Sequence, residues 1–324
     1  MIVHRYRAAR RLAGVCAFGL VLPAAAQPFP NGPINVIVPL APGDAADVAA
    51  RAMGEEISKT LNTALLVINR PGAGGALGTK SVVQARKDGQ TILFAPNAAL
   101  TIRSVVDPQA ANYDAFRDLA PLGLSSRSPS VLVVRKDAAY RNLAELIEQA
   151  KKSPGSVRIG HPGAGSVGEF CIQLTSTLAN ATFEAIPYTG AGPSVVALRG
   201  GHIEGAVMAL GAAGTHIKSG AFRGIVSSHR VAEYADIPTL RELGYPQELF
   251  GVWFGFLAPA GIPDDARKAL VSAIEQAVKS PTITAKLAPL GTLQGYATPE
   301  QMSAEMREEF KRVSDVARRA GMVK

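Results

Sequence analysis

The chain reads Asn69-Arg70-Pro71-Gly72-Ala73-Gly74-Gly75-Ala76-Leu77-Gly78 directly after the apolar run Ala64-Leu65-Leu66-Val67-Ile68 and before a segment with helical spacing. The four glycines let the backbone turn sharply and leave its N–H groups uncovered where the helix begins. Free N–H groups and the helix dipole both favour negative charge. The turn is therefore a candidate cradle for a carboxylate, and a tight strand-to-helix turn without a ligand is the alternative.

Strands that alternate with helices surround this turn. Residues 34–40 predict a buried strand, and residues 44–61 carry apolar side chains at helical spacing, with Asp44 or Asp47 placed to cap the helix. The same order returns at residues 64–85 and 91–97. This alternation indicates a parallel sheet with helices on both faces, whose turns share one edge.

A second series of units begins near residue 143. Its predicted elements are helices at 143–152, 167–178 and 194–199 and strands at 157–160, 183–187, 205–210 and 223–227. A return strand at 253–259 and helices at 264–279, 281–288 and 299–320 complete the chain. The sequence thus predicts an α/β protein of two lobes with a cleft between them. Lobe I is expected at 27–125 and 248–324, and lobe II at 126–247.

The N-terminus has the pattern of a secretory signal peptide. Basic residues precede the apolar run 12–22, and small residues follow it, so cleavage is expected near Ala26. The apolar run is too short for a membrane-spanning helix. Arg10-Arg11 loosely matches a twin-arginine signal, and residues 12–16 loosely match a lipoprotein box. We expect an exported protein of the periplasm.

Charge and cysteine content narrow the function of the mature chain. Four of the 34 Lys and Arg residues leave with the signal, so the formal charge falls from +8 to +4. This mild positive charge is spread along the chain and argues against a nucleic-acid surface. Cys171 remains as a single cysteine, which excludes a disulfide within the mature chain and a cysteine-based metal site.

A second glycine turn matches a dinucleotide fingerprint in form. Residues 163–168 read Gly-Ala-Gly-Ser-Val-Gly between a predicted strand and a predicted helix, and Glu184 follows at the required distance. However, His161-Pro162 separates the strand from the first glycine, where the fingerprint normally turns directly. Binding of another ligand by the same N–H groups is the better interpretation.

Catalytic and metal-ligating patterns are absent from the sequence. The histidines of the mature chain have no ligand spacing, and neither a nucleophile elbow nor a phosphate-binding P-loop occurs. We therefore expect neither an enzyme nor a cofactor or metal site, although a triad assembled from distant residues stays open.

Three single residues each allow a structural and a functional interpretation. Asp44 either caps a helix or turns its carboxylate toward the cleft. Trp253 either packs at the lobe junction or forms a ligand wall. Tyr188, at a strand end before a glycine loop, either packs or offers its hydroxyl to a ligand.

Several segments taken together resemble one family. They are residues 33–43, 69–75, 88–93, 186–190, 237–240, 243–246 and 257–261. In this order they are similar to the Bug (Bordetella uptake gene) family, the TctC-like extracytoplasmic solute-binding receptors of tripartite tricarboxylate transporters. The resemblance covers essentially the whole mature chain.

The resemblance implies a two-lobed periplasmic binding protein fold of type II, with two crossover strands, that closes on its ligand. It also implies that backbone N–H groups of the two lobe I turns hold a ligand carboxylate, while lobe II residues select the other end. The implied ligand-binding residues are Ala41, Pro42, Gly43, Asp44, Ala45, Ala46, Gly74, Gly75, Ala76, Asn97, Gly163, Gly165, Ser166, Glu169, Tyr188, Gly190, Met208 and Leu210.

The chain departs from the family pattern at three places. Asp44 stands where a second glycine is usual, Glu169 where a histidine is common, and Ala209-Leu210-Gly211 where Asp or Asn often lies near the ligand. These changes argue against a simple dicarboxylate. The hypothesis is a monocarboxylate with an apolar or aromatic body, or a ligand whose positive group meets Asp44.

The sequence thus predicts a non-catalytic, monomeric periplasmic receptor. It would capture a small organic carboxylate and deliver it to membrane transporter subunits. The alternative is a receptor of the same fold that presents ligand occupancy to a signalling partner such as a sensor kinase.

Overall fold

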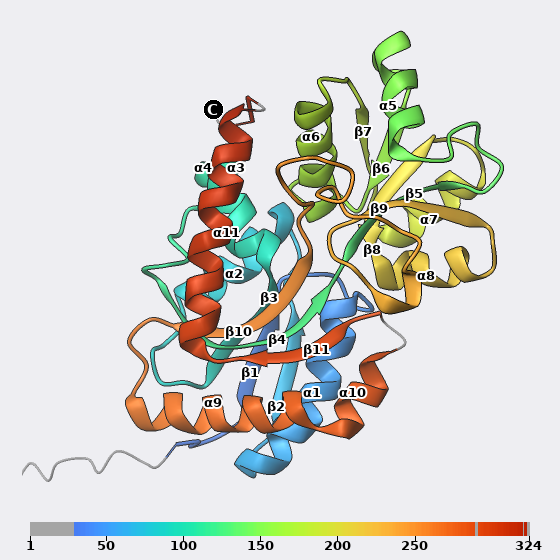
Figure 1. The fold of residues 1–324 in the computed structure, drawn as a ribbon. Coiled ribbons are helices and arrows are strands. Elements are labelled where there is room, and N and C mark those ends of the chain that lie inside the picture. The colour runs from blue at the N-terminus through green and yellow to red at the C-terminus, as the bar shows by residue number, and fades with distance from the viewer. Residues whose placement is uncertain (1–28, 289–290, 320, 323–324) are drawn as a thin grey trace, which may run out of the picture.

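The computed structural model describes residues 29–288, 291–319 and 321–322. The expected signal peptide, residues 1–26, lies outside the described residues. Two α/β lobes stand one above the other, and strands β4 and β10 lead from the lower lobe toward the upper one (Figure 1). This is the two-lobed fold that the sequence predicts.

The lower lobe, lobe I, contains a six-stranded sheet in the order β11-β4-β10-β3-β1-β2. Its strands are β1 (Ile34–Val38), β2 (Leu65–Asn69), β3 (Thr91–Pro96), β4 (Leu119–Ser128), β10 (Val252–Pro259) and β11 (Leu293–Ala297). Strand β1 pairs in parallel with β2 and β3, and β10 runs antiparallel between β3 and β4. The turns after β1 and β2 therefore meet at one edge of the sheet.

The upper lobe, lobe II, contains a five-stranded sheet in the order β7-β6-β8-β5-β9. Its strands are β5 (Ser130–Arg135), β6 (Arg158–His161), β7 (Glu184–Pro187), β8 (Gly205–Ala209) and β9 (Phe222–Ser227). Strand β6 is parallel to β7 and β8, whereas β5 is antiparallel to β8 and β9.

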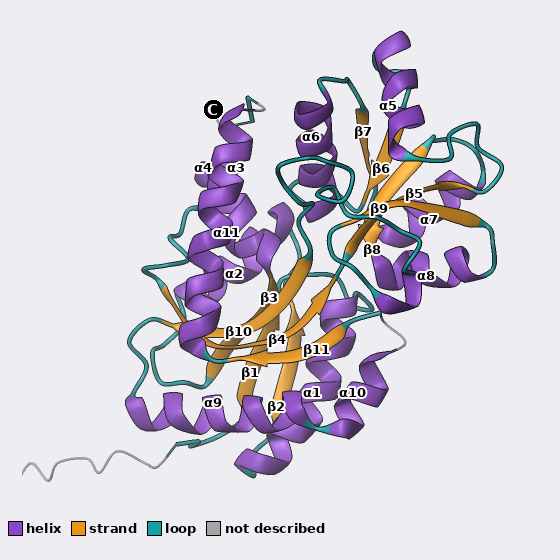
Figure 2. Ribbon diagram, viewed as in Figure 1, coloured by secondary structure: helices purple, strands orange, loops and turns teal. Residues whose placement is uncertain are grey.

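Helices cover both sheets (Figure 2). The α-helices are α1 (Ala45–Leu61), α2 (Ala76–Val83), α3 (Arg103–Val106), α4 (Pro108–Ala111), α5 (Leu143–Lys152), α6 (Val167–Ala179), α7 (Ala191–Arg199), α8 (Leu210–Lys218), α9 (Asp264–Lys279), α10 (Pro281–Leu287) and α11 (Pro299–Arg319). Two 3₁₀ turns, η1 (Ala73–Gly75) and η3 (Ala232–Tyr234), and a π-helix, η2 (Ala98–Ile102), complete the set.

Alternation along the strands of lobe I divides its core into two layers. Ile34, Val36 and Val38 of β1 lie in the cluster formed with α1, α9 and α10. Ile37 points to the opposite face, into the cluster that α2, η2 and α11 cover. Both layers contain fully buried apolar side chains, so the edge that carries the turns rests on a packed base.

The lobes are joined by Pro129, between β4 and β5, and by the segment that links β9 to β10. One apolar cluster includes residues of both lobes, among them Ile102 and Val313 of lobe I and Phe170 and Leu132 of lobe II. Phe170 and Phe250 meet edge to face in it, with ring centroids 5.1 Å apart. The two lobes thus share part of their core.

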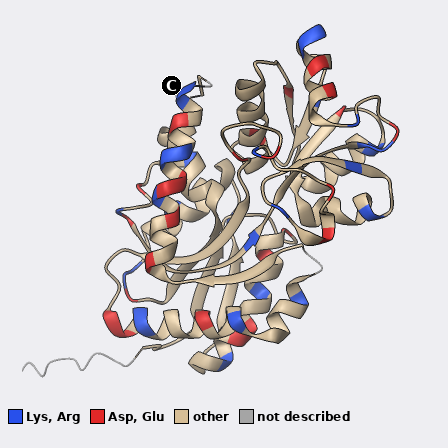
Figure 3. Ribbon diagram, in the orientation of Figure 1, with Lys and Arg blue, Asp and Glu red and all other residues tan. Residues whose placement is uncertain are grey.

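Charged residues are interspersed over both lobes, and along α11 the two signs alternate (Figure 3). Ion pairs such as that between Arg318 and Asp315 lie on its exposed face. Exposed pairs of this kind contribute little to stability. Packing of its apolar face and the hydrogen bonds of its buried Glu309, not its exposed ion pairs, hold α11 in place.

Helix α8 and strand β11 are two of the elements that differ from the sequence prediction. Helix α8 was not predicted, and it begins at Leu210, the last residue of the predicted strand 205–210. Its helical signal in the sequence is weak, because Ala209 supplies no side-chain cap and the helix contains Gly211 and Gly214. Strand β11 was not predicted, since its exposed Leu293 obscures the alternation expected of a half-buried strand.

We predict that Phe94→Ala destabilises lobe I by about 3 to 5 kcal/mol, because it leaves a large cavity in a packed core. Phe94 is fully buried, and its ring lies 4.5 Å from that of Phe256 and 6.0 Å from that of Phe254. Denaturant unfolding measures the loss. Leu66→Ala, on the exposed side of β2, serves as the control and should stay within about 0.5 kcal/mol. Equal effects of the two variants would contradict the assigned core.

Candidate functional site

The first turn of lobe I is organised by two aspartates at the start of α1. Asp44 is the N-cap, and its Oδ1 accepts a hydrogen bond of 2.9 Å from the N–H of Ala46. Asp47 accepts from the N–H of Gly43, and Asn69 donates to Asp47 over 3.0 Å. Since Asn69 ends β2, this contact ties the first turn to the second. The capping interpretation of Asp44 is therefore realised.

Asp44 is exposed at the start of α1. Its side chain can be reached by solvent, yet the protein around it removes much of its hydration. This desolvation raises the pKa of Asp44, the hydrogen bond from Ala46 lowers it, and the charge of Asp47 raises it further, with a net increase. The cap interpretation is observed, and the cleft interpretation of Asp44 stays a prediction.

The second turn of lobe I depends on backbone conformations that favour glycine. Gly72, Gly74 and Gly75 have φ values of 130°, 63° and 93°. A Cβ on Gly75 would stand 2.9 Å from the Cβ of Ala99, so the turn packs directly on η2. Within the described residues, the N–H of Gly74 has no hydrogen-bond acceptor. This turn keeps a backbone donor available at the start of α2.

The turn of lobe II is closed by its own side chains. Ser166 caps α6 and accepts from the N–H of Glu169, while Glu169 accepts a bond of 2.6 Å from the N–H of Gly165. This arrangement resembles a capping box. It places a carboxylate of the protein on an N–H group that a dinucleotide fingerprint would offer to a phosphate, which weighs against dinucleotide binding.

His161, at the end of β6, supports the same turn. It is buried, and its Nδ1 lies 3.0 Å from the carbonyl oxygen of Gly163. Burial lowers the pKa of His161, although the charge of Glu169 and the hydrogen bond to Gly163 raise it. A neutral imidazole that donates from Nδ1 to a carbonyl is a structural support.

Three further residues named from the sequence are buried or half-buried. Met208 and Leu210 are 1% and 5% exposed and belong to the apolar cluster of lobe II. The N–H of Leu210 donates to Pro129 over 2.7 Å. Tyr188 is half-buried and lies over Gly160, where an added Cβ would stand 3.1 Å from the tyrosine ring.

Asn97 is fully buried and forms part of a polar network. Its Nδ2 donates to both carboxylate oxygens of Glu309 at 3.1 Å and to the carbonyl of Gly251 at 3.0 Å. Glu309 also accepts from Thr101 and, over 2.8 Å, from Nε1 of Trp253. The side chains of Asn97 and Trp253 thus form hydrogen bonds within the protein, beneath the cleft.

The two lobes approach each other at their glycine turns. A Cβ on Gly74 of lobe I would stand 3.4 Å from the carbonyl oxygen of Ala164 in lobe II and 3.5 Å from Nη1 of Arg103. A Cβ on Gly165 would stand 2.8 Å from the same Nη1. The predicted residues of the two turns are thus brought together, with Arg103 between them.

Arg103 was not identified from the sequence. It lies in a segment that reads as irregular, because η2 and α3 are short and of unusual geometry. The available signal is a lone arginine at the end of the apolar segment 98–102. A largely buried cation such as Arg103 is costly unless it has a partner.

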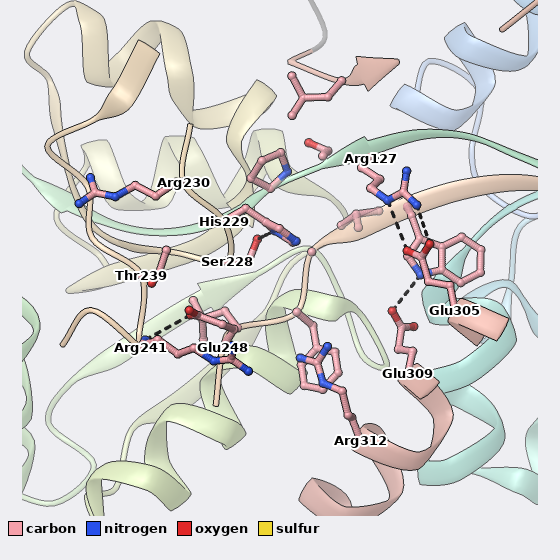
Figure 4. Close-up of a pocket in the computed structure, with 18 of the residues that line it drawn as sticks. Arg127, Ser228, His229, Arg230, Thr239, Arg241, Glu248, Glu305, Glu309 and Arg312 are labelled. Atoms are coloured by element: carbon pink, nitrogen blue, oxygen red, sulfur yellow. Dashed lines mark hydrogen bonds and ion pairs between the residues drawn. The ribbon is translucent and has the colours of Figure 1, made fainter. Parts of the chain in front are cut away.

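A cavity of about 820 Å³ lies between the lobes, beside the segments that connect them (Figure 4). Trp253 lines it, but none of the ligand-binding residues implied by the family resemblance does. Its charged side chains largely bind one another: Arg127 pairs with Glu305 at 2.5 Å, and Arg230 with Glu242 at 2.6 Å. We therefore place the candidate ligand site at the glycine turns and not in this hinge cavity.

The described residues contain neither a helix suited to span a membrane nor a cluster of metal ligands. None of the helices in this part of the chain has the length and apolar character needed to cross a membrane. Across the same residues, no group of three or more His, Cys, Asp or Glu side chains is arranged to hold a metal ion.

Two α/β lobes, two connecting segments and facing glycine turns define the class of two-lobed solute-binding proteins. The chain matches the family described as "Tripartite tricarboxylate transporter family receptor" over residues 49–322. It belongs to this TctC family. The family consists of receptors that bind a solute, so the prediction of a non-enzymatic receptor is confirmed.

Individual relatives agree with this assignment. Protein BugT of Bordetella pertussis is 32% identical over 309 residues, which cover 95% of each chain. The solved periplasmic binding protein BugD is 27% identical, with a TM-score of 0.80 over 91% of this chain and 100% of that one. MatC of Rhodopseudomonas palustris, solved with bound malate, is 28% identical, with a TM-score of 0.79 over 89% of this chain and 99% of that one. The predicted family and fold are confirmed.

Substitution of Asp44 separates its two roles. We predict that Asp44→Ala lowers the free energy of unfolding by about 0.5 to 2 kcal/mol, because Ala46 loses its acceptor. Asp44→Asn keeps an oxygen acceptor and should remain near the wild type. Urea unfolding of the two variants measures both values. Equal losses in the two would show that the charge, and not the cap, stabilises this turn.

Burial of Glu309 predicts a pH dependence of stability. Desolvation raises the pKa of Glu309, while hydrogen bonds from Thr101, Asn97 and Trp253 lower it, with a net increase. The folded chain therefore holds this proton more tightly than the unfolded chain. The contribution of Glu309 to stability should fall as the pH rises from the ordinary carboxyl pKa through the raised one.

Glu309→Gln should remove that fall, so the difference in urea midpoint between wild type and variant should shrink as the pH rises through this window. Glu308→Gln, on the exposed face of the same helix, is the control. Parallel pH profiles of wild type and Glu309→Gln would argue against a raised pKa.

Proposed function

We propose that this receptor captures a small organic carboxylate in the cleft between its lobes and delivers it to the membrane subunits of a tripartite transporter. The proposal is supported by membership of the TctC family and by MatC, whose structure contains malate. The working unit is proposed to be a monomer, since one chain contributes both sets of turns.

The observation that carries the proposal is the meeting of the glycine turns of the two lobes. Gly74 has an N–H without an acceptor among the described residues and lies opposite Ala164 of lobe II. The start of the long helix α1 opens at the same sheet edge and adds the positive end of its dipole. Backbone donors at this edge favour an anion without a charged side chain.

In the proposed site, some of the named residues contact the ligand and others support those that do. Residues 41–46 and 74–76 would offer backbone N–H groups to the carboxylate. Gly163, Ser166, Tyr188 and Gly190 would face the ligand from lobe II, with Glu169 and Gly165 fixing their turn. Asn97, Met208 and Leu210 would support this wall from the buried side.

Location and export complete the proposal. The chain is proposed to be cleaved near Ala26 and to act in the periplasm, the compartment named for its structural relative BugD. Ligand capture would then shift the lobes from an open to a closed arrangement, because only the closed state places both turns on the ligand. The transporter would recognise the closed form.

A ligand panel tests the proposed function. We expect at least one acid among malate, succinate, benzoate and carnitine to raise the melting temperature of the mature protein. A ligand at 100 times its dissociation constant adds about 2.7 kcal/mol of stability. Small-angle scattering should show a smaller radius with the same acid, and mass spectrometry of the purified protein should recover it unchanged.

The neutral amides of the same acids serve as controls. Stabilisation by the amides to the same extent as by the acids, or an unchanged radius at saturation, would overturn a carboxylate receptor that works by closure. A preference for carnitine, which carries a positive group, would identify Asp44 as a ligand contact.

A further inference from the structure

We infer that Arg103 binds the ligand carboxylate directly and adds a side-chain cation to the backbone donors of the glycine turns. The inference rests on the proposed carboxylate site and names the residue that gives it selectivity for charge. Arg103 stands between Gly74 of lobe I and Gly165 of lobe II, so one guanidinium serves both sides of the cleft.

The π-helix η2 determines where Arg103 lies. Side chains fix its unusual turn: Tyr113 donates to the carbonyl of Ala99, and Ser104 donates to the carbonyl of Leu100 over 2.9 Å. Thr101 donates to the carbonyl of Asn97 over 3.0 Å. Insertions of this kind occur frequently at functional sites. Here the π-helix ends directly before Arg103, which is the first residue of α3.

Arg103 has hydrogen-bonding capacity that the protein leaves unused. Its side chain is 13% exposed, and its Nε is buried without a partner. Its Nη2 lies 3.4 Å from Oδ2 of Asp107, which is a long contact for a charged pair. A buried charged donor without an acceptor is unfavourable, so a bound carboxylate would recover that cost.

Glycines on both lobes keep space beside the guanidinium. A Cβ on Gly165 would stand 2.8 Å from Nη1, closer than such contacts are found, and one on Gly74 would stand 3.5 Å from it. Gly165 also has a φ of 75°, which disfavours other residues. Glycine at both positions therefore leaves the guanidinium uncrowded by side chains of the two turns.

The acids nearest to the turns are already bonded to backbone. Asp44 accepts from Ala46 at the start of α1, and Glu169 accepts from Gly165 at the start of α6. Each helix start thus uses a carboxylate of the protein. These two carboxylates are held at their own helices, and Asp107 contacts Nη2 of Arg103, so the buried Nε of Arg103 is the donor left for a carboxylate from outside.

Direct binding by Arg103 implies discrimination by charge. A guanidinium forms charge-assisted hydrogen bonds with a carboxylate that it cannot form with an amide of the same shape. We expect Arg103→Met to weaken binding of any stabilising acid by about 10- to 100-fold, the range of a hydrogen bond to a charged group. Its affinity for the corresponding amide should be unchanged.

Two variants control for charge and geometry. Arg86→Met removes the same charge from an exposed position in lobe I and should leave acid binding unchanged. Arg103→Lys keeps the charge without the planar fork and should bind with intermediate affinity. A role of Arg103 in structure alone would lower the melting temperature of Arg103→Met without changing its acid-to-amide ratio, and that result would overturn the inference.

A second measurement does not depend on knowing the natural ligand. Acetate, the smallest carboxylate of this type, is titrated into ¹⁵N-labelled protein while the Nε–H signal of Arg103, assigned from its loss in Arg103→Lys, is followed by NMR. A saturable shift with acetate and none with acetamide supports direct contact. An unmoved Nε–H signal, with or without shifts at Gly74, overturns it.

The two proposals fail in different ways. If no acid of the panel stabilises the wild type, the receptor function as proposed is wrong, whatever the NMR signal shows. If an acid binds equally well to wild type and Arg103→Met, the receptor function stands and Arg103 is not a ligand contact.

Discussion

A carboxylate buried in the core, that of Glu309, connects the parts of the chain on which the cleft depends. Burial of a carboxylate is costly unless donors surround it. Here Asn97, Thr101 and Trp253 all donate to it. These donors come from both ends of η2 and from the strand that returns from lobe II. The last helix of the chain thus fixes the segment that leads to Arg103 and the strand next to the hinge.

The parts of the fold that the sequence predicts are those with local signals. Strand β1 is a β-branched run, α1 begins at an aspartate, and the glycine turns stand between strand and helix, so each can be located from a few neighbouring residues. The family pattern then orders these units into two lobes. For the same reason the sequence alone marks the glycines at 74 and 165 as turn residues.

The remaining features depend on contacts between distant residues. Asn97 was named as a ligand residue, yet it is buried against Glu309, which lies 212 positions later. Met208 and Leu210 are buried in the apolar cluster of lobe II. The sequence does not indicate this orientation, because it does not predict that α8 begins at Leu210. Arg103 was missed because a π-helix has no periodicity of its own to mark it.

Asp44 and Glu169 depart from the family pattern, and in the structure both carboxylates bind backbone N–H groups at helix starts. Both acids occupy N–H groups at helix starts, so they reduce the number of backbone donors that remain for a ligand. A site with fewer backbone donors gains more from a side-chain cation. Of the two acids, Glu169 belongs to the lobe II turn beside Arg103, and Asp44 belongs to the first turn of lobe I.

The apolar cluster shared by the lobes has a thermodynamic consequence. Ile102 and Val313 of lobe I are buried in one cluster with Phe170 and Leu132 of lobe II, so opening of the lobes brings apolar surface into water. Closure on a ligand buries that surface again, and burial of apolar surface lowers the heat capacity. Solute binding should therefore have the negative heat-capacity change of a hydrophobic process, even though the contacts to the solute itself are polar.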